Sequence, residues 1–535
     1  MRASVDATVA AVAGITVLGF LLRAAVLLRP IGVIDKLFIP DDTYYTLTIA
    51  RSMANGHGPT VDGHTLTSGF QALLGFLMVP VYWLSDNPDT ALRIDLALLV
   101  VVDTATIVVL AWIAYRVAGR VAAVVAAALW AISPVAVSMA LGGLETSLAI
   151  FGAMTLVATW IWANDRPSTR RAVVTGVVAG LAVLARVDLL LLIALLGGLQ
   201  LWRGPRRLIV PGAIAGAVVL APWWIWCTIQ FGTPVPTSGS AAHRLAPLSP
   251  FAREGMAQVA GAVAGGPFDV WRSLRVRLND HPVVGMLVFW AFVVALVLVG
   301  AWWARRRVMP QLAVAALPVF AAGLLVFYAW FGVAWYFTRY LAPVACVVSL
   351  MLAIAAEYAW RARGVWRVPA LVATAAVLVI GLVAAVRANS GFLTDTTITP
   401  SAFDSVTGYR DAAMEVVRIP PEGAVLGAFQ SGAFGYFAND RLEVVNLDGV
   451  VNPDAEQAMR DDTTVAYMRD RSVDWLADFT LHIVEFAVKS KEQLETPPTV
   501  EAVKDLRQFP PFPGFALAEI HWPLSTSSGG APAGG

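Results

Sequence analysis

Charge is scarce in this sequence: only 14% of its 535 residues are Asp, Glu, Lys or Arg, whereas 58% are hydrophobic. A soluble protein of this length needs a more polar surface, so the composition indicates a protein that crosses a membrane several times. The net charge of +1 provides no basic surface for nucleic acid, which is excluded as a partner. Cysteine is also rare, and Cys227 and Cys346 lie in apolar runs that indicate neither a disulfide nor a zinc site.

A cleavable signal peptide is lacking as well. The first apolar run, about residues 8–28, is long enough to span a membrane and has no small-residue cleavage site after it, which predicts an uncleaved signal anchor. We divide the nearly continuous run 172–202 near Arg186 and Asp188, because two charges in mid-bilayer are costly. Eleven spans are predicted in all, the other ten near residues 91–115, 120–139, 146–163, 172–184, 187–202, 208–229, 283–303, 310–330, 340–357 and 367–387.

Arginines in the short loops predict the orientation. If the apolar stretch 69–84 lies at the membrane interface instead of crossing, the arginine clusters all fall on the cytoplasmic side. The outer loops are then 29–90, 142–146, 230–282 and the segment around 331–340. Residues 1–387 are predicted to form the transmembrane domain, and the more polar segment 388–523 a small extracytoplasmic α/β domain. The tail, 524–535, is low in complexity and predicted to be disordered.

Two adjacent carboxylates, Asp41 and Asp42, follow the first span in "IPDDTYYTLTIARSMANGHGPTVDG". One interpretation is structural, because Pro40 precedes a helical pattern: one aspartate caps the helix, and the other is a first-turn acid favoured by the helix dipole. The other interpretation is chemical, because further polar side chains follow the pair. They are Tyr44, Tyr45, His57, Asp62, His64 and Gln71. Such a group suits a general base, a metal site or a substrate-binding surface.

Later outer segments add further ionisable residues. They are Glu145 between two spans, the pair Arg186 and Asp188, and Arg339 with Tyr336 and Tyr340 at the start of a span. Each has a structural alternative: a first-turn acid for Glu145, an ion pair for Arg186 and Asp188, and interfacial aromatics for the tyrosines. Arg339 lies on the side where the positive-inside rule does not explain it. Together these acids and arginines suit an anionic, lipid-linked substrate.

Several segments, in order, resemble bacterial glycosyltransferases of the GT-C superfamily, including the arabinofuranosyltransferase and mannosyltransferase types. They include "DDTYYTLTIARSMANGHGPTVDGHTLTSGFQ", "SPVAVSMALGGLETSL", "LAVLARVDLLLL", "WYFTRYLAPV" and "GAFGYFANDRLEVVNLDGVVN". The resemblance covers nearly the whole chain. It implies a mainly α polytopic membrane protein of about eleven transmembrane helices with an outer C-terminal domain. The implied activity is transfer of a sugar from a polyprenyl-phosphate donor to a cell-envelope glycan, lipid or protein acceptor, on the outer face of the bacterial plasma membrane.

The acidic doublet of GT-C enzymes falls on Asp41 and Asp42 here, and their second acidic position on Glu145. We predict Asp41 as the general base of a single-displacement, inverting reaction, with Asp42 orienting the acceptor or a cation. Arg186 and Arg339 are predicted to contact the donor phosphate. Glu145 and Asp188 are predicted to bind the sugar or a divalent metal.

The chain departs from its relatives in "FGTPVPTSGSAAHRL", where a phosphate contact would pass to His243 or Arg244. No cofactor is required by the sequence, and a divalent metal at Asp41, Asp42 or Glu145 is left open. The rival interpretations are a polytopic lipid or glycolipid transporter or flippase, which predicts charges deep in several helices, and a non-enzymatic scaffold.

Overall fold

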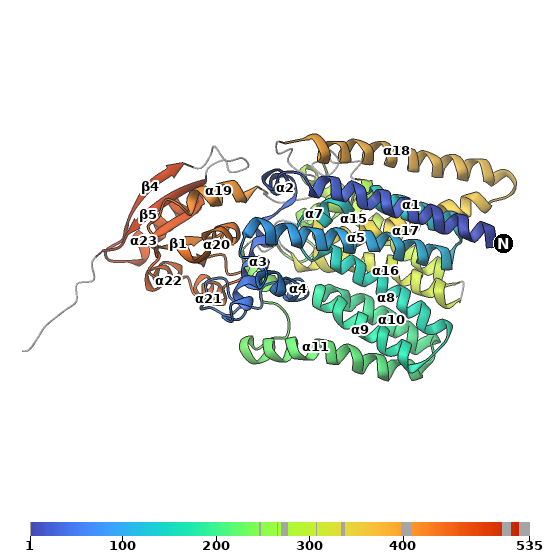
Figure 1. Cartoon of the computed structure of the whole chain (residues 1–535), viewed down its shortest axis with the longest axis horizontal. Helices are drawn as coiled ribbons and strands as arrows, with labels where there is room; N and C mark the ends of the chain where they lie inside the picture. Colours follow the sequence, from blue (N-terminus) through green and yellow to red (C-terminus); the bar gives the residue numbers. More distant parts are fainter. Residues whose placement is uncertain are drawn as a thin grey trace, which may run out of the picture.

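The computed structural model describes residues 2–245, 248–264, 266–268, 277–305, 308–332, 338–396, 408–505 and 515–523. A bundle of long helices lies end to end with a smaller part that contains a β-sheet (Figure 1). The chain enters the sheet-containing part after the last long helix of the bundle, α18 (Arg367–Thr394).

Helices lie at all eleven predicted spans. They are α1 (Arg2–Leu27), α5 (Pro88–Val117), α6 (Arg120–Ile132) with α7 (Pro134–Leu141), α8 (Thr146–Asp165), α9 (Thr169–Ala185), α10 (Leu190–Arg203), α11 (Ile209–Phe231), α15 (Pro282–Ala304), α16 (Met309–Phe331), α17 (Thr338–Arg361) and α18. Among the described residues, eight helical stretches are long and apolar enough to cross a membrane, or nine if α6 and α7 form one span. With 17 and 14 residues, α9 and α10 are shorter, so length supports fewer full spans than predicted.

The predicted break between α9 and α10 is confirmed. Helix α9 ends at Ala185, and a single 3₁₀ turn, Val187–Leu189, leads into α10. Arg186 and Asp188 therefore lie in a turn at the ends of two helices.

The segment predicted as the first outer loop folds into three short helices, α2 (Ile31–Phe38), α3 (Asp41–Ala54) and α4 (Ala72–Tyr82). Helix α4 has 11 residues. At 1.5 Å per residue it is roughly 16 Å long, about half the thickness of a bilayer's hydrocarbon core. Its length therefore favours the interfacial placement predicted for residues 69–84.

The span predicted at 120–139 is broken. Helices α6 and α7 meet at Ser133 with a bend of 52°, because Pro134 has no N–H to continue the first helix. Arg23 of α1 donates to the carbonyls of Trp130 (3.1 Å) and Ala131 (2.8 Å) at the end of α6. Asp103 of α5 accepts from Arg23 (2.7 Å) and from Trp130 Nε1 (3.1 Å). This buried network gives the Ala131 carbonyl a partner at the break, and it gives the Trp130 carbonyl a second partner besides the Ser133 N–H at 3.3 Å.

The C-terminal part holds a five-stranded sheet in the order β2-β1-β3-β5-β4. Its strands are β1 (Val425–Ala428), β2 (Glu443–Asn446), β3 (Trp475–Phe479), β4 (Thr499–Asp505) and β5 (Phe515–His521). Strand β1 pairs in parallel with β2 and β3, whereas β5 is antiparallel to both β3 and β4. The small C-terminal α/β fold predicted from the sequence is thus confirmed; the domain boundary at 387/388 stays a prediction.

Helices cover both faces of this sheet. Successive residues of β3 point to opposite faces. Trp475 belongs to the hydrophobic cluster that includes α19 (Tyr409–Val416) and α20 (Gly432–Ala438), whereas Leu476 belongs to a second cluster with α22 (Thr464–Asp470) and α23 (Thr480–Gln493). Helix α21 (Pro453–Arg460) also belongs to the C-terminal part, whereas α12 (Ser238–Leu245) and α13 (Arg253–Ala264) follow α11, and α13 packs against α15 of the bundle. Helix α20 also packs against α3 of the first outer loop, which joins the two parts of the molecule.

Candidate active site

Asp41 bridges the two parts of the molecule. It is buried, and its two carboxylate oxygens accept hydrogen bonds from the backbone N–H groups of Gly432 and Ala433, each at 2.8 Å. A Cβ on Gly432 would lie 2.3 Å from the carbonyl oxygen of Asp41, so only glycine permits this approach. Asp41 thus caps α20, a helix of the C-terminal domain, whereas its own helix has no side-chain cap. Burial raises its pKa to about 7, although the two N–H donors oppose the shift.

Asp42 has a different environment. Its side chain is 38% exposed and forms an ion pair with Arg339 at the start of α17, whose side chain is only 8% exposed. The neighbouring aspartates therefore have separate partners: backbone amides of the C-terminal domain for Asp41, and a guanidinium of the bundle for Asp42. Of the two, Asp42 is the carboxylate that a substrate can reach.

Arg186 contacts the backbone of the helix turn that carries Arg339. It donates to the backbone carbonyls of Arg339 (2.9 Å) and Tyr340 (3.2 Å) and to the Tyr328 hydroxyl (2.8 Å), and it forms an ion pair with Asp188. The structure therefore brings together the two arginines that were predicted to contact phosphate. The Arg186–Asp188 ion pair, the structural alternative, is also present.

Glu145 faces this pair of arginines. It is 5% exposed, burial raises its pKa, and the charges of Arg186 and Arg339 oppose that shift. Its Oε2 atom has no hydrogen-bond partner among the described residues, and neither do the hydroxyls of Thr146 and Ser147 in the first turn of α8. Buried polar atoms without partners are costly in a folded protein. Their gathering at the start of α8 indicates a place where a polar ligand completes the hydrogen bonding.

The other predicted residues of the first outer loop lie in various places. Tyr44 donates to Asp35 (2.6 Å), Tyr45 donates to the Phe429 carbonyl (3.2 Å), and Gln71 accepts from Thr46 (2.9 Å). Tyr45 thus belongs to the contact with the C-terminal domain, as does the ring of Tyr44, which packs against Tyr436 and Phe437 of α20, whereas Gln71 holds the loop together. His57 and His64 are exposed.

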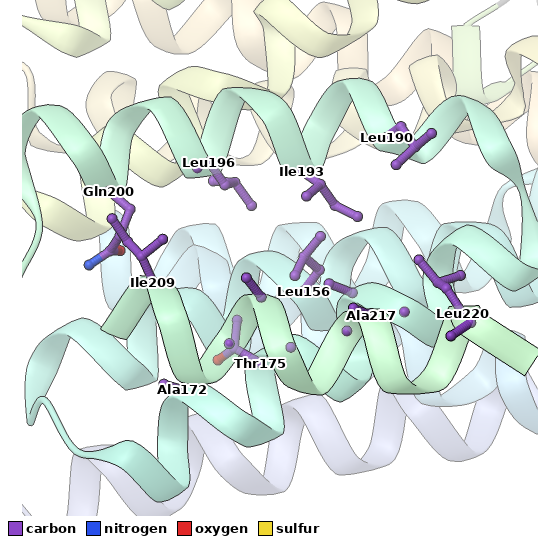
Figure 2. Close-up of a pocket in the computed structure, with 18 of the residues that line it drawn as sticks. Leu156, Ala172, Thr175, Leu190, Ile193, Leu196, Gln200, Ile209, Ala217 and Leu220 are labelled. Carbon is purple, nitrogen blue, oxygen red and sulfur yellow. The ribbon is translucent and has the colours of Figure 1, made fainter. Parts of the chain in front are cut away.

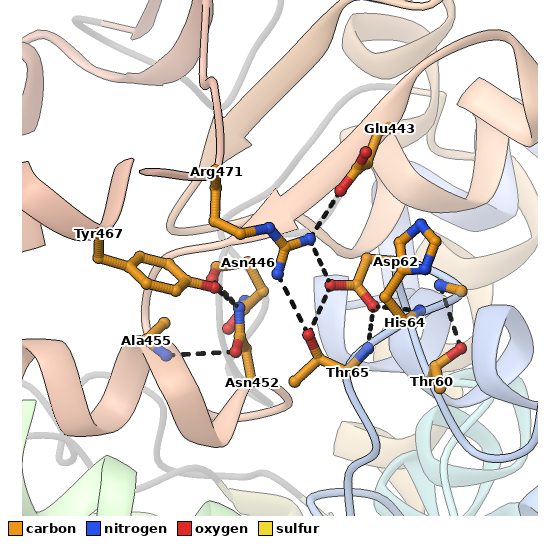
Figure 3. Close-up of polar contacts among 11 residues, drawn as sticks. Thr60, Asp62, His64, Thr65, Glu443, Asn446, Asn452, Ala455, Tyr467 and Arg471 are labelled. Atoms are coloured by element: carbon orange, nitrogen blue, oxygen red, sulfur yellow. Dashed lines mark hydrogen bonds and ion pairs between the residues drawn. The ribbon is translucent and has the colours of Figure 1, made fainter. Parts of the chain in front are cut away.

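His64 belongs to a loop that fastens the two parts together (Figure 3). Asp62 accepts from the backbone N–H groups of His64 (2.9 Å) and Thr65 (2.7 Å), and from Arg471 of the C-terminal domain (2.9 Å). Arg471 also donates to Glu443 (2.6 Å). Both carboxylate oxygens of Asp62 have hydrogen-bond partners, so this group has a structural role: it holds the loop to the C-terminal domain.

His243 and Arg244 lie on α12. The His243 ring contacts Phe331 and the carbonyl of Gly332 (3.1 Å), and Arg244 pairs with the buried Glu456 of α21 at 3.3 Å. Arg244 therefore fastens the long outer loop to the C-terminal domain, and no contact joins it to Arg186 or Arg339 among the described residues. Tyr336 lies outside the described residues.

Two carboxylates near the site were not predicted. Asp448 follows β2 in "NLDGVVN", is 6% exposed, and has a pKa raised to about 8 by burial and, in part, by the charges of Asp42 and Asp41. Asp95 of α5 is fully buried, and neither of its oxygens has a partner among the described residues. The position of Asp448 directly after a strand is the sequence signal that could have found it; Asp95 is one acid in an apolar run and gave no such signal.

No group of three or more His, Cys, Asp or Glu side chains within the described ranges is placed to hold a metal ion. The metal site left open at Asp41, Asp42 or Glu145 therefore stays a prediction.

A large apolar cavity lies between α8, α9, α10 and α11 (Figure 2). Its volume is about 790 Å³, and polar side chains such as Asn164 and Gln200 are few among its lining residues. Two of its walls, α9 and α10, meet at the turn that carries Arg186. On α10 the lining begins at Leu190, directly after that turn, and the apolar chemistry of the cavity suits a hydrocarbon chain.

Solved structures with the same fold place these features in a known architecture. The chain resembles the archaeal oligosaccharyltransferase AglB from Archaeoglobus fulgidus, in complex with an inhibitory peptide and a dolichol-phosphate (TM-score 0.56, 15% identity, 90% of this chain and 71% of that chain covered). It also resembles ArnT from Cupriavidus metallidurans bound to undecaprenyl phosphate (TM-score 0.53, 14% identity, 95% and 97% covered). A further structure of the Archaeoglobus enzyme contains zinc and sulfate (TM-score 0.55, 14% identity, 89% and 70% covered).

No protein-family model matches the chain, and no curated protein matches it in sequence. The GT-C-like fold predicted from the sequence is confirmed by these neighbours. The finer resemblance to arabinofuranosyltransferases stays a prediction.

Proposed function

We propose that the protein is a membrane glycosyltransferase that moves a sugar from a polyprenyl-phosphate donor to a glycan, lipid or protein acceptor on the extracytoplasmic face of a bacterial plasma membrane. The observation that carries this proposal is the polar group of Asp42, Arg339, Arg186 and Glu145, which lies where the helix bundle meets the C-terminal domain. The two structural neighbours whose complexes contain a polyprenyl or dolichol phosphate support it.

We assign the general base to Asp42, in place of Asp41. Both oxygens of Asp41 are held by backbone amides of α20, whereas Asp42 is the more exposed of the two. In the proposed inverting step, Asp42 accepts the proton of the acceptor hydroxyl, the acceptor oxygen bonds to the anomeric carbon, and the bond from that carbon to the phosphate oxygen breaks. The polyprenyl phosphate leaves with the electron pair of that bond.

Arg339 and Arg186 are proposed to stabilise the departing phosphate. A guanidinium binds phosphate oxygens with parallel hydrogen bonds. In the structure Arg339 pairs with Asp42, so a phosphate that takes this place on Arg339 releases Asp42 to act as base. Donor binding would thereby prepare the base. Glu145 is proposed to accept hydroxyl groups of the sugar with its unpartnered Oε2.

The apolar cavity between α8 and α11 is proposed to hold part of the polyprenyl chain. It adjoins the turn of Arg186 and is lined almost entirely by apolar atoms. A chain bound there would place its phosphate at the arginine pair.

The test is turnover by the purified full chain in detergent, with no gradient across a membrane. Labelled polyprenyl-phosphate mannose, glucose and arabinofuranose serve as donors, and solubilised envelope glycolipids as acceptors. We expect one donor to be consumed, and Asp42→Asn to lose about a thousandfold in rate while its elution and melting temperature match the wild type. Near-normal turnover by Asp42→Asn would overturn the base assignment, and gradient-dependent lipid movement without donor cleavage would favour the transporter alternative.

A further inference from the structure

The C-terminal sheet has a topological switch point. From β1 the chain passes through α20 to β2 on one side, and then through α21 and α22 to β3 on the other side of β1. Helices cover opposite faces of the sheet, as the two packing groups around β3 show. In open sheets of this kind, ligands bind outside the carboxyl ends of the strands where the order reverses, here between β1 and β3.

A histidine and a buried aspartate occupy this position. Asp478, near the end of β3, is fully buried and accepts from the backbone N–H of Phe429 (2.6 Å), which follows β1, so its carboxylate joins the two strand ends. It also accepts from Phe479 N (2.7 Å) and from His482 Nδ1 (2.6 Å). The His482 side chain is 33% exposed, and its ring packs against Phe429 at 4.7 Å between centroids.

The arrangement fixes how His482 can act. Because Asp478 accepts from Nδ1, the imidazole is held in one orientation, and its pKa is raised chiefly by this hydrogen bond. Nε2 has no hydrogen-bond partner among the described residues. An oriented, partly exposed ring nitrogen beside an aromatic face is a combination that a binding site requires and that sheet stability does not.

The position is close to the candidate active site. Tyr409 lies between them: its pKa is raised by burial and by the charges of Asp41, Asp478 and Asp42, and its hydroxyl donates to Gln430 (3.3 Å), the residue after Phe429. On the other side, Tyr45 of α3 donates to the Phe429 carbonyl. The switch point of the C-terminal domain therefore adjoins the helix that carries the proposed base.

We propose that the β1–β3 switch point binds a carbohydrate group of the acceptor, with His482 Nε2 as hydrogen-bond partner of a sugar hydroxyl and Phe429 as an apolar surface for the ring. This inference rests on the proposed function and deepens it by giving the acceptor a site distinct from that of the donor. A sugar ring presents C–H groups on its faces and hydroxyls at its edge, which matches an aromatic side chain beside an imidazole. Asp478 is a positioning residue in this scheme, because it acts through His482.

The experiment separates the two ring nitrogens of His482. The amide nitrogen of Gln reaches the place of Nε2, whereas that of Asn reaches only the place of Nδ1. Saturation-transfer difference NMR on the full chain in detergent measures binding of methyl mannoside, methyl galactoside and methyl arabinofuranoside, with inorganic phosphate as competitor. We expect His482→Ala and His482→Asn to bind the preferred glycoside about tenfold more weakly, and His482→Gln to keep most of the affinity.

His521 provides the matched control. It ends β5, which is antiparallel to β3, so it lies beside the amino end of β3, away from the switch point. Its side chain is half exposed. His521→Ala should bind glycosides as the wild type does. Full binding by His482→Asn with loss in His482→Gln would show that only the bond to Asp478 matters and would overturn the proposal, as would displacement of the glycoside by phosphate.

Donor cleavage in the same preparations distinguishes this proposal from the proposed function. Transfer of the sugar to water needs no acceptor, so the His482 variants should cleave the donor at the wild-type rate while their KM for the glycolipid acceptor rises about tenfold. Glycoside binding of the expected pattern without any donor cleavage would leave the carbohydrate site in place and refute the transferase. Equal losses of donor cleavage and acceptor transfer would refute the separate acceptor site.

Discussion

Two regions of the molecule hold buried carboxylates, and they differ in how many of the carboxylate oxygens have hydrogen-bond partners. Where the first outer loop meets the C-terminal domain, Asp41 and Asp62 have partners on both oxygens. At the start of α8, Glu145 Oε2 and the hydroxyls of Thr146 and Ser147 have no partner among the described residues. In the first region the hydrogen bonding of the carboxylates is complete within the protein. In the second it is incomplete, as expected of a site where a ligand binds.

After Asp42→Asn, the largest loss of rate should come from Glu145→Gln. If the α8 region serves a ligand, this change should lower the rate of sugar transfer about a hundredfold, because a neutral amide no longer balances the two arginines or accepts hydroxyl groups in the same way. The melting temperature should change little, because Glu145 Oε2 has no hydrogen-bond partner among the described residues that the change would remove. Comparison of initial rates with thermal unfolding of the same preparation checks both; a large loss of stability would assign Glu145 to the fold.

Arg339→Ala tests the phosphate contact. We expect the KM for the donor to rise about thirtyfold, with less than a twofold change in the KM for the acceptor, because a charge-assisted bond to phosphate is removed. Arg339→Lys should recover part of the affinity, since it retains the charge without the planar fork. The matched control is Arg410→Ala, which removes an outer arginine that pairs with Asp89. Equal rises in both KM values would refute a specific phosphate contact.

Asp41→Asn tests the contact between the first outer loop and helix α20 of the C-terminal domain. An amide can accept only one of the two N–H bonds of α20, so the C-terminal domain should be destabilised by about 1–2 kcal/mol. Limited proteolysis of the chain between the bundle and the C-terminal domain reports this directly. Asp42→Asn should show no such loss, and faster cleavage of Asp42→Asn than of Asp41→Asn would reverse our assignment of the two aspartates.

Substitutions of two adjacent glycines on α10 test whether the polyprenyl chain of the donor occupies the apolar cavity. Gly197 lines it and Gly198 does not, and a Cβ at either position meets no atom within 4 Å. Gly197→Leu should occupy part of the cavity and raise the KM for a long-chain donor about fivefold, with little effect on a donor with a short prenyl chain. Gly198→Leu should behave as the wild type. If both variants act alike, the polyprenyl chain lies elsewhere.

The last prediction concerns how the stability of the protein depends on pH. Burial raises the pKa of Asp35 and of Asp41 from 3.8 to about 7, and that of Asp448 to about 8. Between about pH 4 and pH 8 the folded protein therefore holds more protons than the unfolded chain, so the free energy of unfolding falls as the pH rises. Melting temperatures in detergent from pH 5 to 8.5 should decline. Asp448→Asn should reduce the slope, and Asp454→Asn, at an exposed position on α21, serves as the matched control.

The sequence allowed the bundle to be predicted because long apolar runs and loop arginines are local signals. The break at Arg186 was predictable for the same reason, since two charges interrupt an apolar run. The break at Ser133 was missed, because its compensation depends on Arg23, which lies 107 and 108 residues away from the two carbonyls that it binds. A local pattern cannot show such a partner.

The sequence predicted which residues lie together at the candidate site better than it predicted what each residue does there. Glu145, Arg186 and Arg339 were predicted together from their common side of the membrane, and the structure brings them together. The difference between Asp41 and Asp42 was not predictable, because the partner that occupies Asp41 is 391 residues distant in sequence. Asp448 and His482 were missed because their positions depend on how the C-terminal strands are ordered.

Arg23 has a consequence for the order of assembly. This buried cation belongs to α1, but the carboxylate that neutralises it comes 80 residues later in the chain, and the carbonyls of the α6 break come later still. Until α5 and α6 have been synthesised, α1 carries a charge that the bilayer interior disfavours. We therefore expect α1 to be held stably in the bilayer only once α5 and α6 are packed against it, so the stability of these three helices is coupled.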